Sequence, residues 1–344
     1  MIAGLLPLRI AAAVALAWGA IAAVAPTGGR MMRREKREGN VRMQFIGHRG
    51  ASAVHPENTL KAVRGALAVD AGFEVDLQLL KDGEVIVLHD DTLSRTAAIG
   101  WISWMLGLDA KANEVIRQPV RQLDLTQAQT VKVGDSSHSE PVPTFATVLR
   151  ELHEVPQPMR DGDDSDHRRH LAHCFAELKA FGYHSGARHD PELTKEAAAA
   201  VTKAKVSPSQ LTWISFSLSA LVDIKRRLPD HKAYLIAYVS TPEEAFAVAR
   251  LAVDSGMDGI DLNADNSVVN TELVEWLHAR GKEIAVWVWK APGSNDKESV
   301  WEHMEQCGVD FFTSNLPPAL DGWRARHAHG HRHRDSARRS APKS

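Results

Sequence analysis

The chain has 344 residues, of which 44% are hydrophobic and 24% are charged, as is usual for a globular protein. Its formal net charge of -2 excludes the basic excess that a nucleic-acid-binding surface requires. Of the two cysteines, Cys174 lies in an apparent buried strand and Cys307 in a helical run, so we expect two packed thiols and no disulfide framework.

An apolar segment opens the chain. Arg9 precedes an unbroken apolar run of 15 residues, Ile10 to Val24. This pattern is typical of a secretory signal peptide, and the run is shorter than the about 20 residues that a membrane-spanning helix needs. We interpret residues 1–25 as a signal peptide or short membrane anchor, which predicts a secreted or membrane-anchored protein.

Residues 26–43 form a basic linker, in which five cationic side chains favour the cytoplasmic side of a membrane: Arg30, Arg33, Arg34, Lys36 and Arg37. The alternative is therefore a cytoplasmic protein whose translation starts later, at Met31, Met32 or Met43.

Three apolar runs then follow that are predicted to be strands: Gln44 to Gly47, a run that carries Glu74 and Asp76, and Glu84 to Leu88. Each carries a pair of polar side chains: His48 and Arg49, Glu74 and Asp76, and His89 and Asp90. Because residues i and i+2 of a strand project from the same face, Glu74 and Asp76 direct two carboxylates into one space. Polar groups at the ends of successive strands are typical of the active site of an α/β barrel or open sheet.

The first helix is predicted to begin at Asn58 or Thr59, both good N-cap residues, and to run to about Ala71, with Gly72 ending it. A second helix is predicted to begin at Pro143-Thr144 and to end near Leu152. Beyond it, strand-like and helical runs alternate, which indicates repeated βα units and a parallel sheet. The predicted strands are His173–Leu178, Leu211–Phe216, Lys232–Val239, Gly259–Leu262, Ile284–Trp289 and Phe311–Thr313. The predicted helices are Asp190–Lys203, Ser219–Arg227, Pro242–Asp254, Asn270–Arg280 and Lys297–Gln306.

This pattern predicts one barrel domain over residues 44–322. Nine strand-like runs exceed the eight of a barrel, so one of them, within the Glu74 to His89 hairpin, is expected to be irregular or outside the barrel.

Three segments depart from the alternation. Residues 99–108 are apolar and form a small insertion, interpreted as a helix over the barrel mouth; the alternative is an apolar lip that holds a lipid chain or contacts a membrane. Residues 156–170 form a polar loop, and His167, His170 and His173 are predicted to be surface histidines. The His- and Arg-rich tail, residues 323–344, is predicted to be disordered.

Glu74, Asp76 and Glu177 are three oxygen donors at predicted strand ends. Hard oxygen ligands without cysteine suit Mg²⁺ or Ca²⁺. The structural alternative is that they only pair with Arg49 or Lys179. The nearby histidines favour the metal site, because imidazole titrates near neutral pH and serves as a general acid or base.

These residues resemble the glycerophosphodiester phosphodiesterase family. The resemblance depends on the order and spacing of several motifs, and it extends more weakly through Glu177-Leu178-Lys179, Ser215-Phe216 and Thr313 to about residue 320. The motifs are His48-Arg49-Gly50, Pro56-Glu57-Asn58-Thr59, Glu74-x-Asp76, Asp82-Gly83, His89-Asp90 and Leu93-x-Arg95-Thr96.

The resemblance implies a TIM-type (β/α)8 barrel that hydrolyses a glycerophosphodiester to glycerol 3-phosphate and an alcohol such as choline or ethanolamine. It implies His48 as general base and His89 as general acid, and the sequence also allows the reverse assignment. It also implies phosphate contacts from Arg49 and Lys179, a divalent cation on the three carboxylates, and supporting roles for Glu57 and Asn58. Asp90 is expected to orient a histidine or to cap the strand end.

Departures from the family pattern concern substrate recognition: Leu80 and Ala97 replace usual threonines, and Trp287-Val288-Trp289-Lys290 replaces a Trp-Thr-x-Asn pattern. One alternative is therefore lysophospholipase D or phosphoinositide phospholipase C-like activity on a lipid phosphodiester, with membrane contact through residues 1–25 and 99–108. Another is a non-catalytic barrel that binds a phosphate ligand. Oligomeric state is not indicated.

Overall fold

The computed structural model describes residues 43–98, 110–135, 137–154, 172–180, 189–288, 295–317 and 323. The predictions for residues 1–25, 99–108, 156–170 and the tail after Trp323 lie outside this part of the chain. Contacts divide the chain into Met1–Asn40 and Val41–Ser344, and every described residue belongs to the second unit.

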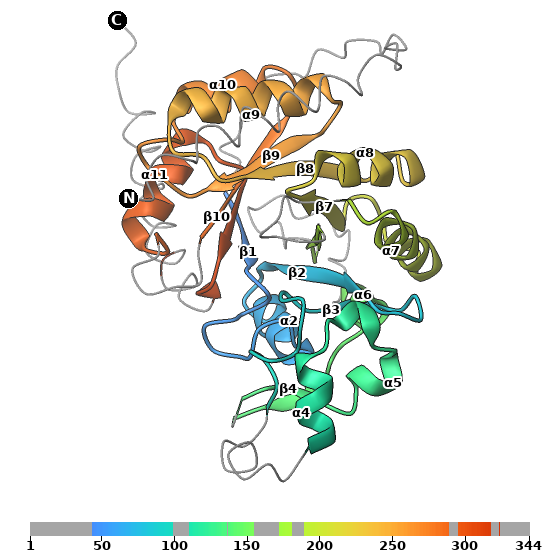
Figure 1. The fold of residues 1–344 in the computed structure, drawn as a ribbon. Coiled ribbons are helices and arrows are strands. Elements are labelled where there is room, and N and C mark those ends of the chain that lie inside the picture. The colour runs from blue at the N-terminus through green and yellow to red at the C-terminus, as the bar shows by residue number, and fades with distance from the viewer. Residues whose placement is uncertain are drawn as a thin grey trace, which may run out of the picture. The chain divides into compact units, whose positions relative to one another are not determined.

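Eight parallel strands form a closed barrel, as predicted (Figure 1). Closure comes from β1, which pairs with both β11 and β2. A ninth strand, β3 (Val85–Val87), pairs antiparallel with the outer part of β2 and lies outside the barrel, so the irregular strand is the one predicted. The barrel strands are β1 (Gln44–Gly47), β2 (Gly72–Leu79), β6 (Cys174–Leu178), β7 (Leu211–Ser215), β8 (Lys232–Ala237), β9 (Gly259–Asn263), β10 (Glu283–Trp287) and β11 (Phe311–Ser314).

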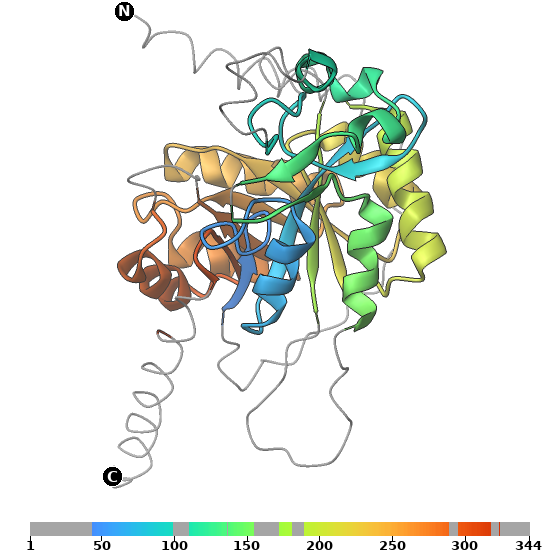
Figure 2. The same cartoon turned by 90° about the horizontal axis from the view of Figure 1, so that it is seen from below.

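Helices surround the strands (Figure 2). Most begin at a side-chain cap, in which Thr59, Asp190, Ser217, Thr241 or Asn270 accepts a hydrogen bond from a backbone N–H of the first turn. Each such cap contributes about 1 kcal/mol to helix stability. The helices around the barrel are α2 (Leu60–Leu67), α6 (Phe145–Glu154), α7 (Pro191–Ala204), α8 (Leu218–Arg227), α9 (Pro242–Asp254), α10 (Thr271–His278) and α11 (Glu298–Cys307).

Helix α2 ends at Leu67, four residues before the predicted end. Asp70 has a positive φ of 55°, which turns the chain out of the helix and back toward the barrel. Gly72 therefore begins β2 rather than ending the helix. A Cβ at this position would lie 2.5 Å from Ile46 Cδ1 and 2.7 Å from the His173 carbonyl oxygen, so only glycine permits this close approach of strands.

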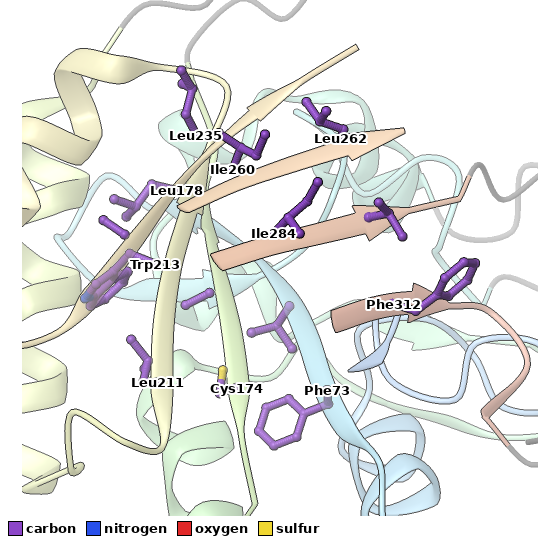
Figure 3. Close-up of a cluster of buried hydrophobic side chains, with 14 of the residues drawn as sticks. Phe73, Cys174, Leu178, Leu211, Trp213, Leu235, Ile260, Leu262, Ile284 and Phe312 are labelled. Carbon is purple, nitrogen blue, oxygen red and sulfur yellow. The ribbon is translucent and has the colours of Figure 1, made fainter. Parts of the chain in front are cut away.

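The largest apolar core lies between the strands and their helices, with Phe73, Trp213, Leu262 and Phe312 fully buried (Figure 3). Cys174 belongs to this core, and both cysteines are buried free thiols, as predicted. Inside the barrel a separate cluster forms an apolar floor: Ile46, Phe175, Ile214, Tyr234, Ile236, Ala285 and Phe311. His173 was predicted to be a surface histidine but is half-buried, and its ring stacks on Phe311 with 5.7 Å between centroids.

The chain between β3 and α6 packs around a second apolar cluster, which includes Leu93, Leu123 and Val133 together with Leu80 from the turn before β3. Its described elements are α4 (Ala110–Arg117), η1 (Val120–Gln122), α5 (Leu125–Ala128), β4 (Lys132–Gly134) and β5 (Ser139–Pro141). Among the described residues, no helix is long and apolar enough to span a bilayer.

Candidate active site

The turn after β1 places the first group of polar side chains. Arg49 and Gly50 both have positive φ, 57° and 78°. A Cβ on Gly50 would lie 2.4 Å from the carbonyl carbon of Ala62, so the turn packs directly on α2. This backbone directs the N–H of Arg49 to Glu74 Oε2, 2.8 Å away, and couples β1 to β2 at the barrel mouth.

Three carboxylates converge inside this end of the barrel. Glu74 and Asp76 project inward from β2, and the register of β6 sets Glu177 beside Asp76. One oxygen from each of these buried residues lies within 4.8 Å of the other two. Lys179 Nζ is 2.8 Å from both Asp76 Oδ1 and Glu177 Oε1. The three predicted metal ligands are therefore brought together, although two of them also pair with Lys179.

Burial and mutual repulsion affect the carboxylates of this cluster unequally. Burial, together with the charges of Asp76 and Glu177, raises the pKa of Glu74 well above its usual value. Burial also opposes ionisation of Asp76, but Lys179 and Arg49 hold its pKa well below the usual range. The buried Glu74 Oε1 has no hydrogen-bond partner among the described residues. Three hard oxygen donors close together, one of them with an unpartnered buried oxygen, fit a divalent cation.

Asn58 and Arg49 hold Asp76 in place. Asn58 adopts φ of 57°, and its Nδ2 donates to Asp76 Oδ2 over 2.7 Å. Arg49 Nε lies 3.4 Å from the same oxygen, and its Nη1 donates to Glu57 Oε1 over 2.8 Å. The predicted phosphate ligand Arg49 therefore already contacts two carboxylates.

His48 lies directly after β1, and its Nδ1 is 2.9 Å from Asn315 Oδ1. Since an amide oxygen only accepts, Nδ1 carries the proton and Nε2 keeps its lone pair. Burial and then the charge of Arg49 lower the pKa of His48 to about 3, so the ring is neutral at neutral pH. Asn315 is itself held by Asp296, whose Oδ2 accepts from the Asn315 backbone N–H over 2.7 Å.

His89 is oriented by a chain of charged groups. Its Nδ1 lies 2.7 Å from Asp90 Oδ1, and Arg95 Nε donates to Asp90 Oδ2 over 2.6 Å. Hydrogen bonds from His89 and Arg95 lower the pKa of Asp90, so this carboxylate is ionised at neutral pH. Arg95 also forms a two-pronged contact of 2.6 and 2.9 Å with Glu57, which links His89 to Arg49.

The structure thus brings the site residues predicted from the sequence together: they come from the turn after β1, the middle of β2, the carboxyl end of β6 and the residues just after β3. Three residues were missed as site residues: Arg95, Asp296 and Asn315. Arg95 belongs to one of the recognised motifs, which was a usable signal. Asn315 directly follows the last strand, but nothing in the sequence indicated its partner.

The part of the chain that is similar to known proteins is the barrel that carries this site. The model of the "Glycerophosphoryl diester phosphodiesterase family" matches residues 48–317. The chain is 45% identical over 291 residues to a "Probable glycerophosphodiester phosphodiesterase 1" of Mycobacterium tuberculosis, covering 81% of this chain and 91% of that protein. It is 26% identical over 276 residues to a "Glycerophosphodiester phosphodiesterase" of Caldanaerobacter subterraneus, covering 80% and 95%.

Solved structures share the fold. A putative glycerophosphodiester phosphodiesterase from Galdieria sulphuraria aligns with a TM-score of 0.62 at 20% identity, covering 82% of this chain and 97% of that one. An Oleispira antarctica phosphodiesterase in complex with the product sn-glycerol-3-phosphate aligns with a TM-score of 0.57 at 20% identity, covering 82% and 96%. At this identity the likeness shows the barrel architecture.

Proposed function

The chain belongs to the glycerophosphoryl diester phosphodiesterase family, and we propose that it hydrolyses a glycerophosphodiester to glycerol 3-phosphate and an alcohol with the help of a divalent cation. The observation that carries this proposal is the convergence of three buried carboxylates, Glu74, Asp76 and Glu177, beside two oriented histidines at one end of the barrel.

Glu74, Asp76 and Glu177 would hold the cation. Oxygen donors alone favour Mg²⁺ or Ca²⁺ over softer metals. When bound, the cation neutralises charge on the nonbridging phosphate oxygens. Arg49 and Lys179 lie against the same carboxylates, so they are placed to contact a phosphate bound there.

His48 is proposed as the general base. Its neutral ring, with Nδ1–H donated to Asn315, leaves Nε2 available to accept the proton of the attacking hydroxyl or water. His89 is proposed as the general acid, since Asp90 holds its Nδ1 and so orients the ring for delivery of a proton to the leaving oxygen. Glu57 pairs with both Arg49 and Arg95, so it connects the turn that carries His48 to the residues that orient His89.

A lipid phosphodiester is the second candidate substrate, favoured by aromatic side chains at the carboxyl ends of β7 and β10. Phe216 and Trp287 make an edge contact with 6.2 Å between ring centroids. Tyr238, just after β8, is 49% exposed. Such a surface suits an acyl chain as well as a small alcohol group.

The test is release of glycerol 3-phosphate from glycerophosphocholine by the full chain, beside a lysophospholipid as second substrate. His48→Ala should lower kcat by about 10²-fold or more, the usual contribution of a general base. His153→Ala removes an exposed histidine of α6 whose Nε2 bonds the Ala204 carbonyl oxygen, and this variant should act like the wild type. Turnover of the lysophospholipid alone would select the lipid substrate. If folded, metal-loaded protein turns over neither substrate, the remaining explanation is a non-catalytic barrel that binds a phosphate ligand.

A further inference from the structure

A polar layer crosses the barrel interior beneath the mouth. Barrels are filled by layers of four side chains from alternate strands. The strand register sets four inward residues at one level: Glu74, Ile214, Asp261 and Thr313. The strand neighbours of Asp261 and Thr313, among them Leu262 and Phe312, point the other way into the outer core.

Three of these four residues are polar and have unused hydrogen-bonding capacity. Glu74, Asp261 and Thr313 are only 2%, 1% and 2% exposed. Glu74 Oε1, Asp261 Oδ1 and Thr313 Oγ1 have no hydrogen-bond partner among the described residues. Buried polar atoms are almost always satisfied, by protein, water or ligand. The inward residues one level below are all apolar or aromatic: Ile46, Phe175, Tyr234 and Ala285. The missing partners must therefore come from above, where Asp76 and Glu177 lie.

A hydrated cation would supply those partners. Mg²⁺ takes six ligands and Ca²⁺ takes six to eight, so three carboxylates leave positions for water. Each such water donates hydrogen bonds and needs acceptors. Asp261 feels the charge of Glu177 but lies outside the group of oxygens within 4.8 Å of one another, so it is too far to join the three as a direct ligand.

We propose that Asp261 and Thr313 form an outer shell of the metal site, in which they accept hydrogen bonds from water molecules held by the cation. The inference rests on the proposed metal site of Glu74, Asp76 and Glu177. Outer-shell partners of this kind set metal affinity, and their loss commonly costs about 10–100-fold.

The test is the affinity of the full chain for Ca²⁺ and for Mg²⁺, measured by isothermal titration calorimetry without substrate. Asp261→Asn should weaken binding by about 10-fold or more. Thr313→Val removes a hydroxyl at nearly constant volume and charge, and it should weaken binding severalfold. The matched control is Glu151→Gln, which exchanges a buried carboxylate on α6 that pairs with Arg64 instead. It should bind like the wild type.

The outcomes separate the claims. Unchanged affinity in both Asp261→Asn and Thr313→Val, with metal bound by the wild type, would overturn the outer shell and leave the metal site standing. Loss in Asp261→Asn alone would overturn the shared water shell in favour of long-range charge. A wild type that binds neither ion would overturn the proposed metal site itself. Circular dichroism shows whether each variant folds. If Asp261→Asn does not fold, the metal affinity of Thr313→Val tests the proposal by itself.

Discussion

Asn315 selects the nitrogen through which His48 acts. Its Oδ1 accepts from Nδ1 over 2.9 Å, and Asp296 fixes the Asn315 backbone. Asn315→Ala frees the ring to rotate and to change tautomer, so we predict that kcat falls by about 10²-fold with little change in KM. Steady-state kinetics on glycerophosphocholine measure this. The control is Ser52→Ala, which removes a marginal contact of 3.5 Å to the same amide oxygen and should therefore change kcat less than twofold. Equal losses in kcat for both variants would contradict the role of Asn315.

Arg95 orients His89 through Asp90, with a further two-pronged contact to Glu57. Its side chain is 46% exposed, so the contribution of its ion pairs to folding is small. Arg95→Met should therefore lower kcat by about 10-fold while the melting temperature stays nearly unchanged. Arg64→Met is the matched control, because Arg64 makes a similar two-pronged contact to Glu151 and is 61% exposed. If both variants lose stability alike and neither loses activity, Arg95 is only a surface ion-pair residue.

At the scale of elements, the turn between β1 and α2 positions His48 and Arg49 in the site. Gly50 combines a φ of 78° with a Cβ position 2.4 Å from Ala62. Gly83, in the turn between β2 and β3, has a φ of 87° but nothing within 4 Å of its Cβ position. Gly83→Ala should therefore lower the free energy of unfolding by about 1 kcal/mol, from backbone strain alone.

Gly50→Ala adds a backbone overlap to the same strain and should lower the free energy of unfolding by about 3 kcal/mol. It should also abolish activity, because any relief moves Arg49 away from Glu74. Urea denaturation measures both variants. Equal losses at the two positions would show that the turn does not pack on α2 as tightly as the structure indicates.

Local patterns in the sequence account for most of the elements. The alternation of strands and helices, the N-caps and the extra strand in the Glu74 to His89 hairpin were predictable because each depends on neighbouring residues. The early end of α2 was not, because it depends on Gly72 meeting Ile46 and His173 from other strands. His173 was taken for a surface residue because its contact with Phe311 joins two strands distant in sequence.

In the site, too, features that depend on neighbouring residues were predictable, and contacts between residues distant in sequence were not. Glu74 and Asp76 are two residues apart on one strand, so their shared direction was predictable. The contact between His48 and Asn315 spans 267 residues, and that between Glu57 and Arg95 spans 38. Asp261 gave no signal, because a carboxylate within a strand has the same pattern whether it pairs with a cation or lies unpartnered in a barrel.

At the scale of the whole molecule, His173 couples stability to pH from the opposite end of the barrel. Its ring nitrogens bond the Ser209 carbonyl oxygen and the Thr212 hydroxyl, each at 3.0 Å. Burial lowers its pKa to about 4, against 6.5 in the unfolded chain. The unfolded state therefore binds more protons between these values, and the contribution of His173 to stability is complete above pH 6.5 and lost as the pH falls to about 4.

His173→Gln should accordingly show a flatter dependence of the free energy of unfolding on pH than the wild type between pH 6.5 and 4. Urea denaturation at pH 7, 5.5 and 4.5 gives both curves. Parallel curves would mean that the folded and unfolded chains bind the His173 proton equally well.

The central claim is that this barrel cleaves a glycerophosphodiester with a divalent cation held by Glu74, Asp76 and Glu177. The most direct measurement is the rate of glycerol 3-phosphate release from glycerophosphocholine by the full chain, first in EDTA and then after addition of Mg²⁺ or Ca²⁺. We predict turnover that EDTA abolishes, that one of the two ions restores in the wild type, and that neither ion restores in Glu177→Gln. Full turnover by metal-stripped protein would contradict the account.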